Sequence, residues 1–257
     1  MPEQPATSTQ SALDIGTATD VGRVREANED SFLAVRPAGA RGGGALVAVA
    51  DGMGGHKAGE VASALAVQVL QQMLDDSDPA VDADALLTRA FELGNRSIWD
   101  AAAEDVDKEG MGTTFVAALI NADGQAVVAN VGDSRAYVFA GGAAKLLTVD
   151  HTWVNQQVRA GQMTEHEARL SPFRNLLTRS LGSAPRVEID VFMGLQLEAG
   201  DALILVSDGV TGYLEERDFS SILHAGVDAQ AAAERLVQEA VERGGADNAT
   251  AVVVRRR

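Results

Sequence analysis

The sequence predicts an antiparallel α+β fold in which helices flank two sheets. Runs with β-branched enrichment or alternating hydrophobicity predict strands at 13–19, 31–35, 45–50, 113–120, 126–131, 136–139, 187–193, 202–206 and 249–254. Apolar residues at helical spacing predict helices at 61–73, 85–103 and 229–241. Because strands come in consecutive runs and helices gather in a few places, this order favours antiparallel sheets over strict alternation of strand and helix.

Individual elements are justified by their residue patterns. The run ALVAVA at 45–50 contains only small or branched apolar residues, which is typical of a strand buried on both faces. The first helix is indicated by Val61, Leu65, Val69 and Met73, which recur every four residues and so share one face. The two later helical stretches show the same spacing.

A single domain is expected from the 257 residues, because no repeat or long linker divides the chain. Residues 1–12 are polar, contain two prolines and lack the features of a signal peptide, so they predict a disordered leader before a domain at 13–255. No apolar run approaches the roughly 18–20 residues of a membrane span. These features predict a cytoplasmic monomer, and the arginines at 255–257 are expected to form a solvated tail.

Composition excludes several kinds of site. The chain has no cysteine, so disulfides, thiolate zinc sites and cysteine nucleophiles are absent, and any metal must be held by oxygen or histidine. The formal net charge of −16 opposes binding to nucleic acid or to anionic membranes. Neither is therefore expected as a partner.

The segment 150–182 departs from the regular pattern, with short helical pieces and little strand character. An insertion of this length inside a domain is more often a functional flap than an idle loop. We therefore expect a flap at about 150–182.

Four aspartates lie next to predicted strands, and three of them stand beside glycine: Asp51, Asp133, Asp208 and Asp247. One such aspartate is usually a turn former or a helix cap. If the four strand ends meet, however, the carboxylates would repel one another, and a divalent cation would relieve that repulsion. Carboxylate oxygens suit Mg²⁺ or Mn²⁺, and two such ions can activate water against a phosphoryl group, so phosphate ester hydrolysis is the chemistry indicated.

Six motifs resemble, in order, those of the metal-dependent protein phosphatase 2C family: VGRVREANEDSF at 21–32, VADGMGGHKAGEVAS at 49–63, GMGTTFVAAL at 110–119, VGDSRAYVF at 131–139, LVSDGV at 205–210 and GGADNATAVVV at 244–254. The resemblance covers about 13–255. The DGMGGH form and the segment 150–182 are most similar to the bacterial branch, whose members oppose Ser/Thr protein kinases.

The resemblance implies a four-layer α-β-β-α sandwich with two Mn²⁺ or Mg²⁺ ions in a cleft at one edge. By motif position, Asp51 would bridge the two ions and the Gly52 carbonyl would bind the second. Asp208 and Asp247 would complete the first ion's ligands. Phosphoserine and phosphothreonine proteins would be the substrates, with a Ser/Thr kinase as the opposing enzyme.

Three further residues receive roles from the same resemblance. Asp30 would lie beside the second ion through water, and Asp133 would join Asp208 at a third, weaker metal site. Arg25 would bind the substrate phosphate, for which a guanidinium is suited because its fork can meet two phosphate oxygens.

The implied mechanism is direct attack by a metal-bridging water, with no phosphoenzyme. The leaving alkoxide also needs a proton. Animal members have histidine where this chain has Met53, and a thioether cannot donate that proton. His56 is the local substitute, although it is equally suited to a helix-entry role, and His151 is a weaker candidate that is better explained as structural.

Other interpretations have less support. GMGGHK at 52–57 lacks the last glycine of a dinucleotide fingerprint, and no P-loop or serine-hydrolase elbow occurs. DVDKEG at 105–110 begins like a calcium loop but has Val116 in place of the required glutamate. A catalytically inactive regulator that binds phosphoproteins is the alternative function, and an acidic metal-binding domain is a third possibility. The presence of Asp51, Asp208 and Arg25 in their motifs disfavours both.

Overall fold

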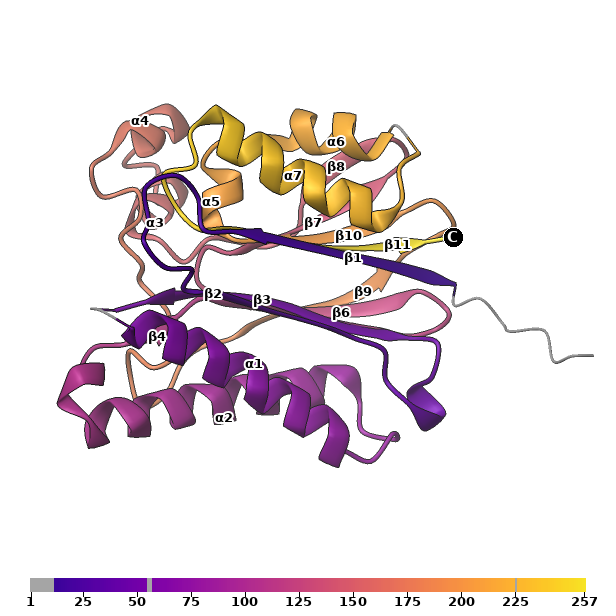
Figure 1. Ribbon diagram of the computed structural model, residues 1–257, viewed down its shortest axis with the longest axis horizontal. Coiled ribbons are helices and arrows are strands. Elements are labelled where there is room, and N and C mark those ends of the chain that lie inside the picture. Colours follow the sequence, from indigo (N-terminus) through magenta and orange to yellow (C-terminus); the bar gives the residue numbers. More distant parts are fainter. Residues whose placement is uncertain (1–11, 55–56, 225) are drawn as a thin grey trace, which may run out of the picture.

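Two antiparallel sheets pack face to face in the computed structural model, which describes residues 12–54, 57–224 and 226–257 (Figure 1). The first sheet has the order Leu13–Asp20 (β1), Ala249–Arg256 (β11), Ala202–Val206 (β10), Arg135–Ala140 (β7) and Ala143–Leu146 (β8). The second has the order Asp30–Val35 (β2), Ala45–Met53 (β3), Phe115–Ile120 (β5), Gln125–Val131 (β6) and Asp190–Gln196 (β9). A short strand, Gly112–Thr113 (β4), pairs with the end of β3.

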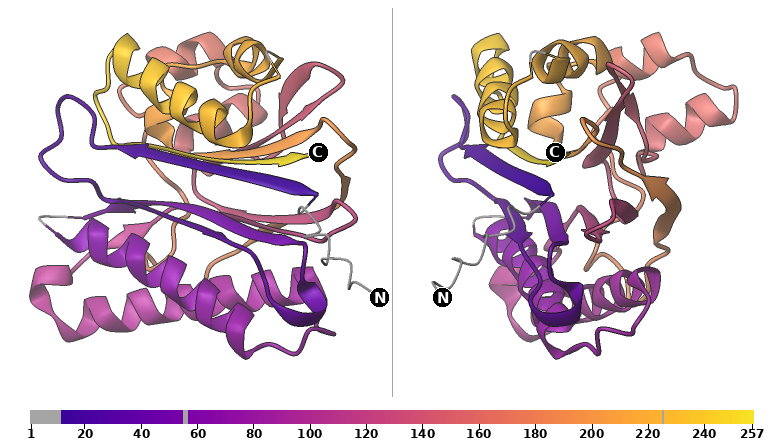
Figure 2. Two further views of the ribbon diagram at one scale, coloured as in Figure 1. Left: turned by 45° about the vertical axis from the view of Figure 1, so that its right-hand side comes forward. Right: turned by 90° about the vertical axis from the view of Figure 1, so that its right-hand side faces the viewer.

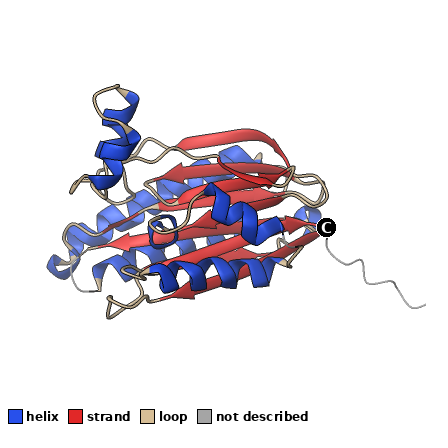
Figure 3. Ribbon diagram, turned by 90° about the horizontal axis from the view of Figure 1, so that it is seen from above, coloured by secondary structure: helices blue, strands red, loops and turns tan. Residues whose placement is uncertain are grey.

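Helices form the two outer layers. Ala58–Asp76 (α1) and Ala83–Glu104 (α2) cover the second sheet. Asp208–Thr211 (α5), Glu216–His224 (α6) and Ala229–Arg243 (α7) lie on the first, and the view from above shows helices over its outer face (Figure 3). Two short 3-10 helices, Gly39–Arg41 and Val106–Lys108, lie in connections. The predicted fold class is therefore confirmed.

Three apolar clusters hold the four layers together. The cluster between the sheets includes Val47, Val49, Leu203 and Val252, all fully buried. One outer cluster joins α1 and α2 to the second sheet, and the other joins α6 and α7 to the first. Because both faces of the central strands are buried, β3, β5 and β10 are apolar along most of their length, which explains the continuous runs in the sequence.

The flap projects from this body as a helical excursion. Trp153–Arg159 (α3) and Glu165–Leu170 (α4) form it, and in the right-hand view of Figure 2 they stand out from the side of the sandwich. Its two ends meet at a bridge between Thr152 and Leu177. Short helices joined at a closed base thus occupy the segment 150–182, and its role as a flap stays a prediction.

Several element predictions need correction. The run at 113–120 is two strands, which pair with different parts of β3 and are separated by Thr114. Strand β9 begins at Asp190, later than predicted. β8 and α5 were not predicted, because each has only four residues, too few to show a period. α6 was also missed, although its buried Phe219, Ile222 and Leu223 do follow helical spacing.

The C-terminal arginines do not form a solvated tail. Arg255 and Arg256 lie in β11, and both donate hydrogen bonds to backbone carbonyls of neighbouring segments. Arg257 pairs with Asp14 at 3.0 Å. The expectation was wrong because a guanidinium on a strand can reach across to carbonyls and carboxylates of adjacent segments.

Candidate active site

Strand β3 carries Asp51 to the end of the sandwich. It does not stop at Ala50, as the sequence suggested, but continues through Met53 by changing its partner from β5 to β4. At the change of partner, the Asp51 N–H donates to Thr114 Oγ1 at 3.0 Å, and the Asp51 carbonyl accepts from the Thr114 N–H at 2.9 Å. The backbone of Asp51 is thus fixed from one side, and its carboxylate is held in a defined place.

Gly52 is required by close backbone packing. A Cβ at this position would lie 2.1 Å from the carbonyl oxygen of Gly59 in α1 and 2.7 Å from that of Glu29. The role expected for this glycine from its motif is a different one, namely access of its carbonyl to a metal ion. The packing constraint is independent of that role and leaves it a prediction.

The other aspartates reach the same end from different elements. Asp30 begins β2 and lies opposite Asp51 in the strand register. Asp133 lies in the connection by which the chain crosses from β6 in one sheet to β7 in the other. Asp208 begins α5 directly after β10, and Asp247 precedes the adjacent strand β11. Strand ends from both sheets therefore converge, as their spacing in the sequence suggested.

The carboxylates strongly affect one another. Burial raises the pKa of Asp51 well above its usual range, and the charges of Asp30, Asp208 and Asp133 raise it further. Burial raises the pKa of Asp133 to about 8, with Asp208 as the next cause. We call Asp30, Asp51, Asp133, Asp208 and Asp247 the carboxylate cluster.

Asp30 and Asp208 show the same effect with different partners. Burial raises the pKa of Asp30 to about 7, against hydrogen bonds from Thr250 and Ser207 that favour its charged form. The pKa of Asp208 is raised by burial and then by the charge of Asp247. Concentrating negative charge in this way is costly for the protein alone, and such clusters are found at functional sites.

Unpaired oxygens indicate what the cluster can bind. Asp30 Oδ1 and Asp208 Oδ1 are buried and accept no hydrogen bond from the described residues. The same holds for Oδ1 of Asn130, in the strand before Asp133. A buried carboxylate oxygen without a donor is unfavourable unless a cation meets it. Among the described residues, no group of three or more acidic or histidine side chains is arranged so that it could hold a metal ion. Even so, hard oxygen donors with unused lone pairs fit Mg²⁺ or Mn²⁺.

Arg25 lies at the edge of this cluster. Its Nη2 donates to Asp247 Oδ2 at 2.7 Å, and its side chain is 48% exposed. The guanidinium thus faces the carboxylates while remaining open to a ligand. The structure therefore brings together Arg25 and the five aspartates that the sequence singled out.

His56, the predicted proton donor, lies outside the described residues. The other histidine considered, His151, is 5% exposed, and its Nδ1 accepts the Gly132 N–H at 3.0 Å. Its Nε2 lies 3.3 Å from Asp190 Oδ2, and burial lowers its pKa. These contacts agree with the structural role preferred for His151.

The base of the flap supports the turn that carries Asp133. On one side of this turn, the His151 N–H donates to the Gly132 carbonyl at 3.0 Å. On the other, Arg135 binds Asp150 through two hydrogen bonds of 2.6 and 2.8 Å. The flap is therefore anchored at the same point as one member of the carboxylate cluster.

Sequence reasoning missed polar residues that support the cluster. The Ser207 hydroxyl donates to Asp30 Oδ2 at 2.8 Å and accepts the Thr250 N–H at 2.9 Å. Asn248 binds the segment before Asp30. Their signal was present in the motifs LVSDGV and GGADN, where each directly precedes or follows a predicted metal ligand.

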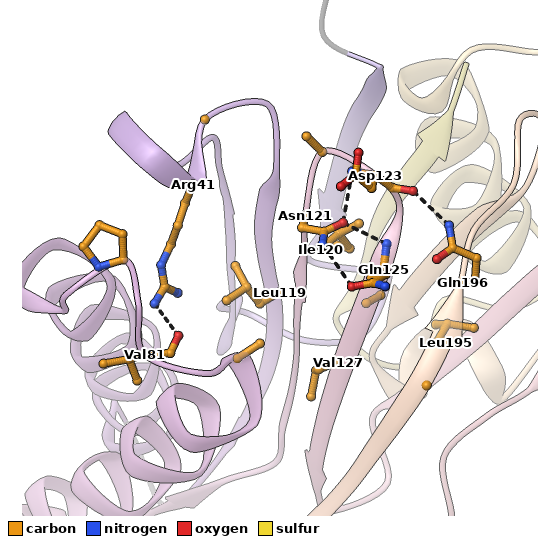
Figure 4. Close-up of a pocket in the computed structure, with 16 residues that line it drawn as sticks. Arg41, Val81, Leu119, Ile120, Asn121, Asp123, Gln125, Val127, Leu195 and Gln196 are labelled. Atoms are coloured by element: carbon orange, nitrogen blue, oxygen red, sulfur yellow. Dashed lines mark hydrogen bonds between the residues drawn. The ribbon is translucent and has the colours of Figure 1, made fainter.

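A separate hollow of about 610 Å³ lies at the opposite end of the second sheet, near the turn between β5 and β6 (Figure 4). Leu119 lies between Arg41 and the amides of Asn121 and Gln125, while Leu195 lies on the far side of Gln125, next to Gln196. The amides bind one another and nearby backbone, and Arg41 binds the carbonyls of Asp78 and Val81. This hollow lacks the concentrated, unpaired carboxylates, so the carboxylate cluster is the better candidate for the active site.

Known proteins are similar to this chain in both sequence and fold. The family model described as protein phosphatase 2C matches residues 22–243. The serine/threonine phosphatase stp of Listeria monocytogenes is 36% identical over 241 residues, which are 93% of this chain and 94% of that protein. The S. agalactiae serine/threonine phosphatase structure has a TM-score of 0.88 at 36% identity and covers 95% of this chain and 100% of that one.

The catalytic domain of the serine threonine protein phosphatase PstP, solved in complex with two manganese ions, has a TM-score of 0.82 at 37% identity. The match covers 95% of this chain and 97% of that one. Together with the family match and the relatives' near-complete coverage, this similarity shows that the chain belongs to the protein phosphatase 2C family.

Proposed function

We propose that this protein hydrolyses phosphoserine and phosphothreonine in other proteins, with Mn²⁺ or Mg²⁺ held by the carboxylate cluster. The observation that carries the proposal is the group of buried carboxylates with unpaired oxygens beside an accessible arginine. Relatives named serine/threonine phosphatases over nearly the whole chain support the same chemistry.

Each part of the cluster receives one task in this proposal. Asp51 would be a ligand of both ions and the Gly52 carbonyl a ligand of the second, with Asp208 and Asp247 holding the first ion and Asp30 lying near the second. Asp133 would serve a third, weaker site with Asp208. When bound, the cations would supply Lewis-acid activation of a water and would offset the charge of the phosphoryl group.

Arg25 would bind the substrate phosphate. Its present partner is Asp247, 2.7 Å away. A cation bound by Asp247 would compete for that carboxylate, and the guanidinium would be free to meet two phosphate oxygens instead. His56 is the proposed donor of a proton to the leaving serine or threonine oxygen.

Purified protein tests this proposal directly. We expect hydrolysis of p-nitrophenyl phosphate and of a phosphothreonine peptide with Mn²⁺ and its loss with a chelator. Asp51→Asn and Asp208→Asn should each lower the rate by about a thousandfold or more, since each variant removes a carboxylate ligand from the metal site. No hydrolysis by the wild-type chain would instead favour the inactive, phosphoprotein-binding alternative, while full activity in either variant would contradict the site assignment.

The cellular setting follows from this function. We propose phosphoproteins made by a Ser/Thr kinase as the substrates of a cytoplasmic, monomeric enzyme. None of the helices in the described part of the chain has the length and apolarity that crossing a bilayer requires.

A further inference from the structure

We infer that Asn248 is a positioning residue for phosphate binding, because it holds the loop 21–29 in the shape that places Arg25 at the carboxylate cluster. The inference rests on the proposed function, since it takes Arg25 as the group that binds the substrate phosphate. Asn248 itself does not contact the substrate in this proposal.

Asn248 binds the loop at three points. Its Nδ2 donates to the carbonyl oxygens of Val21 and Ala27, each at 2.9 Å, and its Oδ1 accepts the Glu29 N–H at 2.9 Å. The two carbonyls can meet only the amide nitrogen and the N–H only the oxygen, so the contacts also fix the orientation of the amide. The first residue of the loop, its last residue and Ala27 between them are therefore all bound by one side chain, which is 4% exposed.

The backbone of the loop runs directly against the segment before β11. Gly22 has a φ of +79°, and a Cβ there would lie 2.4 Å from the carbonyl oxygen of Asp247. The Arg23 N–H donates to the Gly245 carbonyl at 2.7 Å. Arg25 then reaches back to Asp247, the neighbour of Asn248 in the chain.

Apolar packing cannot hold this loop in place. Residues 23–27 are all exposed. Val24, the one large apolar residue among them, is 68% exposed and belongs to none of the three apolar clusters. The shape of the loop therefore depends on its hydrogen bonds. A long arginine that extends from a loose loop would bind phosphate less well, because it must be ordered at each binding event.

Kinetics of the Mn²⁺-loaded protein test the inference. Asn248→Ala should raise KM for a phosphothreonine peptide and the inhibition constant of inorganic phosphate by about tenfold or more, as expected for supporting residues. The change in kcat should be smaller, and the Mn²⁺ concentration for half-maximal activity should stay the same. In an Arg25→Ala background, Asn248→Ala should add little to KM, because its effect passes through Arg25.

Asn95 offers a matched control. It is 2% exposed, its Nδ2 donates to the Ala184 carbonyl at 3.0 Å, and its Oδ1 accepts the Gly182 N–H at 2.9 Å. Asn95→Ala removes a buried amide that holds the loop at Gly182–Ala184. It should therefore lower the stability of the protein without raising KM for the phosphothreonine peptide or the inhibition constant of inorganic phosphate. If Asn248→Ala does not fold, Asn248→Ser provides a small polar side chain that is too short to reach both carbonyls.

Hydrogen exchange of the intact chain reports the loop without turnover. Amides of residues 22–29 should exchange faster in the Asn248 variant than in wild type and in Asn95→Ala. Unchanged exchange of these amides would overturn the inference. So would an Asn248→Ala effect on KM that is just as large in the Arg25→Ala background. A rise in the Mn²⁺ concentration for half-maximal activity as large as the rise in KM would overturn it as well. If Arg25→Ala itself leaves KM unchanged, the proposed role of Arg25 fails as well; if it raises KM and Asn248→Ala does not, only this inference fails.

Discussion

Single residues of the carboxylate cluster show a conflict between stability and function. Asp208 has a buried oxygen without a hydrogen bond, and both burial and Asp247 disfavour its charge. Without a bound cation, this charged carboxylate opposes folding, whereas in the proposed function it would be a ligand of the cation. Residues of this kind are retained for what they bind, at a cost to the stability of the protein alone.

Asp208→Asn should therefore stabilise the metal-free protein while abolishing its activity. Removing one buried charge relieves repulsion from its neighbours, and we expect about 1–3 kcal/mol in the free energy of unfolding. Thermal unfolding with a chelator at pH 8 measures this change. Asp123→Asn removes an equal charge from an exposed turn and should have no such effect. A lower melting temperature for Asp208→Asn than for wild type would contradict this account.

At the scale of elements, the site depends on how closely β3 approaches the start of α1. Gly52 and Gly59 face each other there with no room for a side-chain carbon. The same approach brings the Glu29 carbonyl within hydrogen-bonding distance of the Gly52 N–H, at 3.2 Å. The two glycines therefore set the spacing between a strand and a helix, and with it the position of Asp51.

Gly52→Ala should force these elements apart. We expect a loss of about 1–3 kcal/mol in the free energy of unfolding, as for other overpacked sites, and a large loss of activity. Gly94→Ala in α2 is the matched control, because its nearest neighbour would be 3.7 Å from the new carbon and alanine favours helix. Relative to wild type, the free energy of unfolding measured in urea should fall for Gly52→Ala and rise for Gly94→Ala. Equal stability of Gly52→Ala and wild type would refute the packing argument.

The sequence predicted long elements better than short ones. The central strands and α1, α2 and α7 have patterns set by burial, and the structure places them where the periodicity indicated. β8 is held by tertiary contacts, such as the hydrogen bond from the Ala144 N–H to the Ser220 hydroxyl in α6, and the local sequence carries little trace of these. Likewise, the motifs indicated which aspartates converge, but not that Ser207 and Asn248 support them across long sequence distances.

For the whole molecule, the cluster makes stability depend on pH and metal together. The pKa values of Asp30 and Asp133 rise on folding from 3.8 to about 7 and about 8. The folded protein thus holds more protons than the unfolded chain in this range. At a pH below the pKa of the unfolded chain, these two groups make their full contribution to the free energy of unfolding. That contribution is lost as the pH rises through their pKa values in the folded protein.

The metal-free protein should therefore lose stability as pH rises from about 4 to about 8. Asp133→Asn should flatten the upper part of this fall. Saturating Mn²⁺ should offset it, because cations replace protons on the carboxylates, with about 2.7 kcal/mol expected at a hundred times Kd. Urea unfolding at several pH values, with chelator and with Mn²⁺, measures all three effects. A metal-free protein whose stability increases over this range would show that these carboxylates are ionised in the fold.

The pairing of β1 with β11, in which Leu13 lies opposite Arg256, has a consequence for biosynthesis. A ribosome adds roughly 5–20 residues each second, so β1 waits on the order of ten to fifty seconds for its partner strand. Asp247 and Asn248 leave the exit tunnel equally late. The nascent chain therefore cannot complete the first sheet or the carboxylate cluster until residue 256 has emerged from the ribosome.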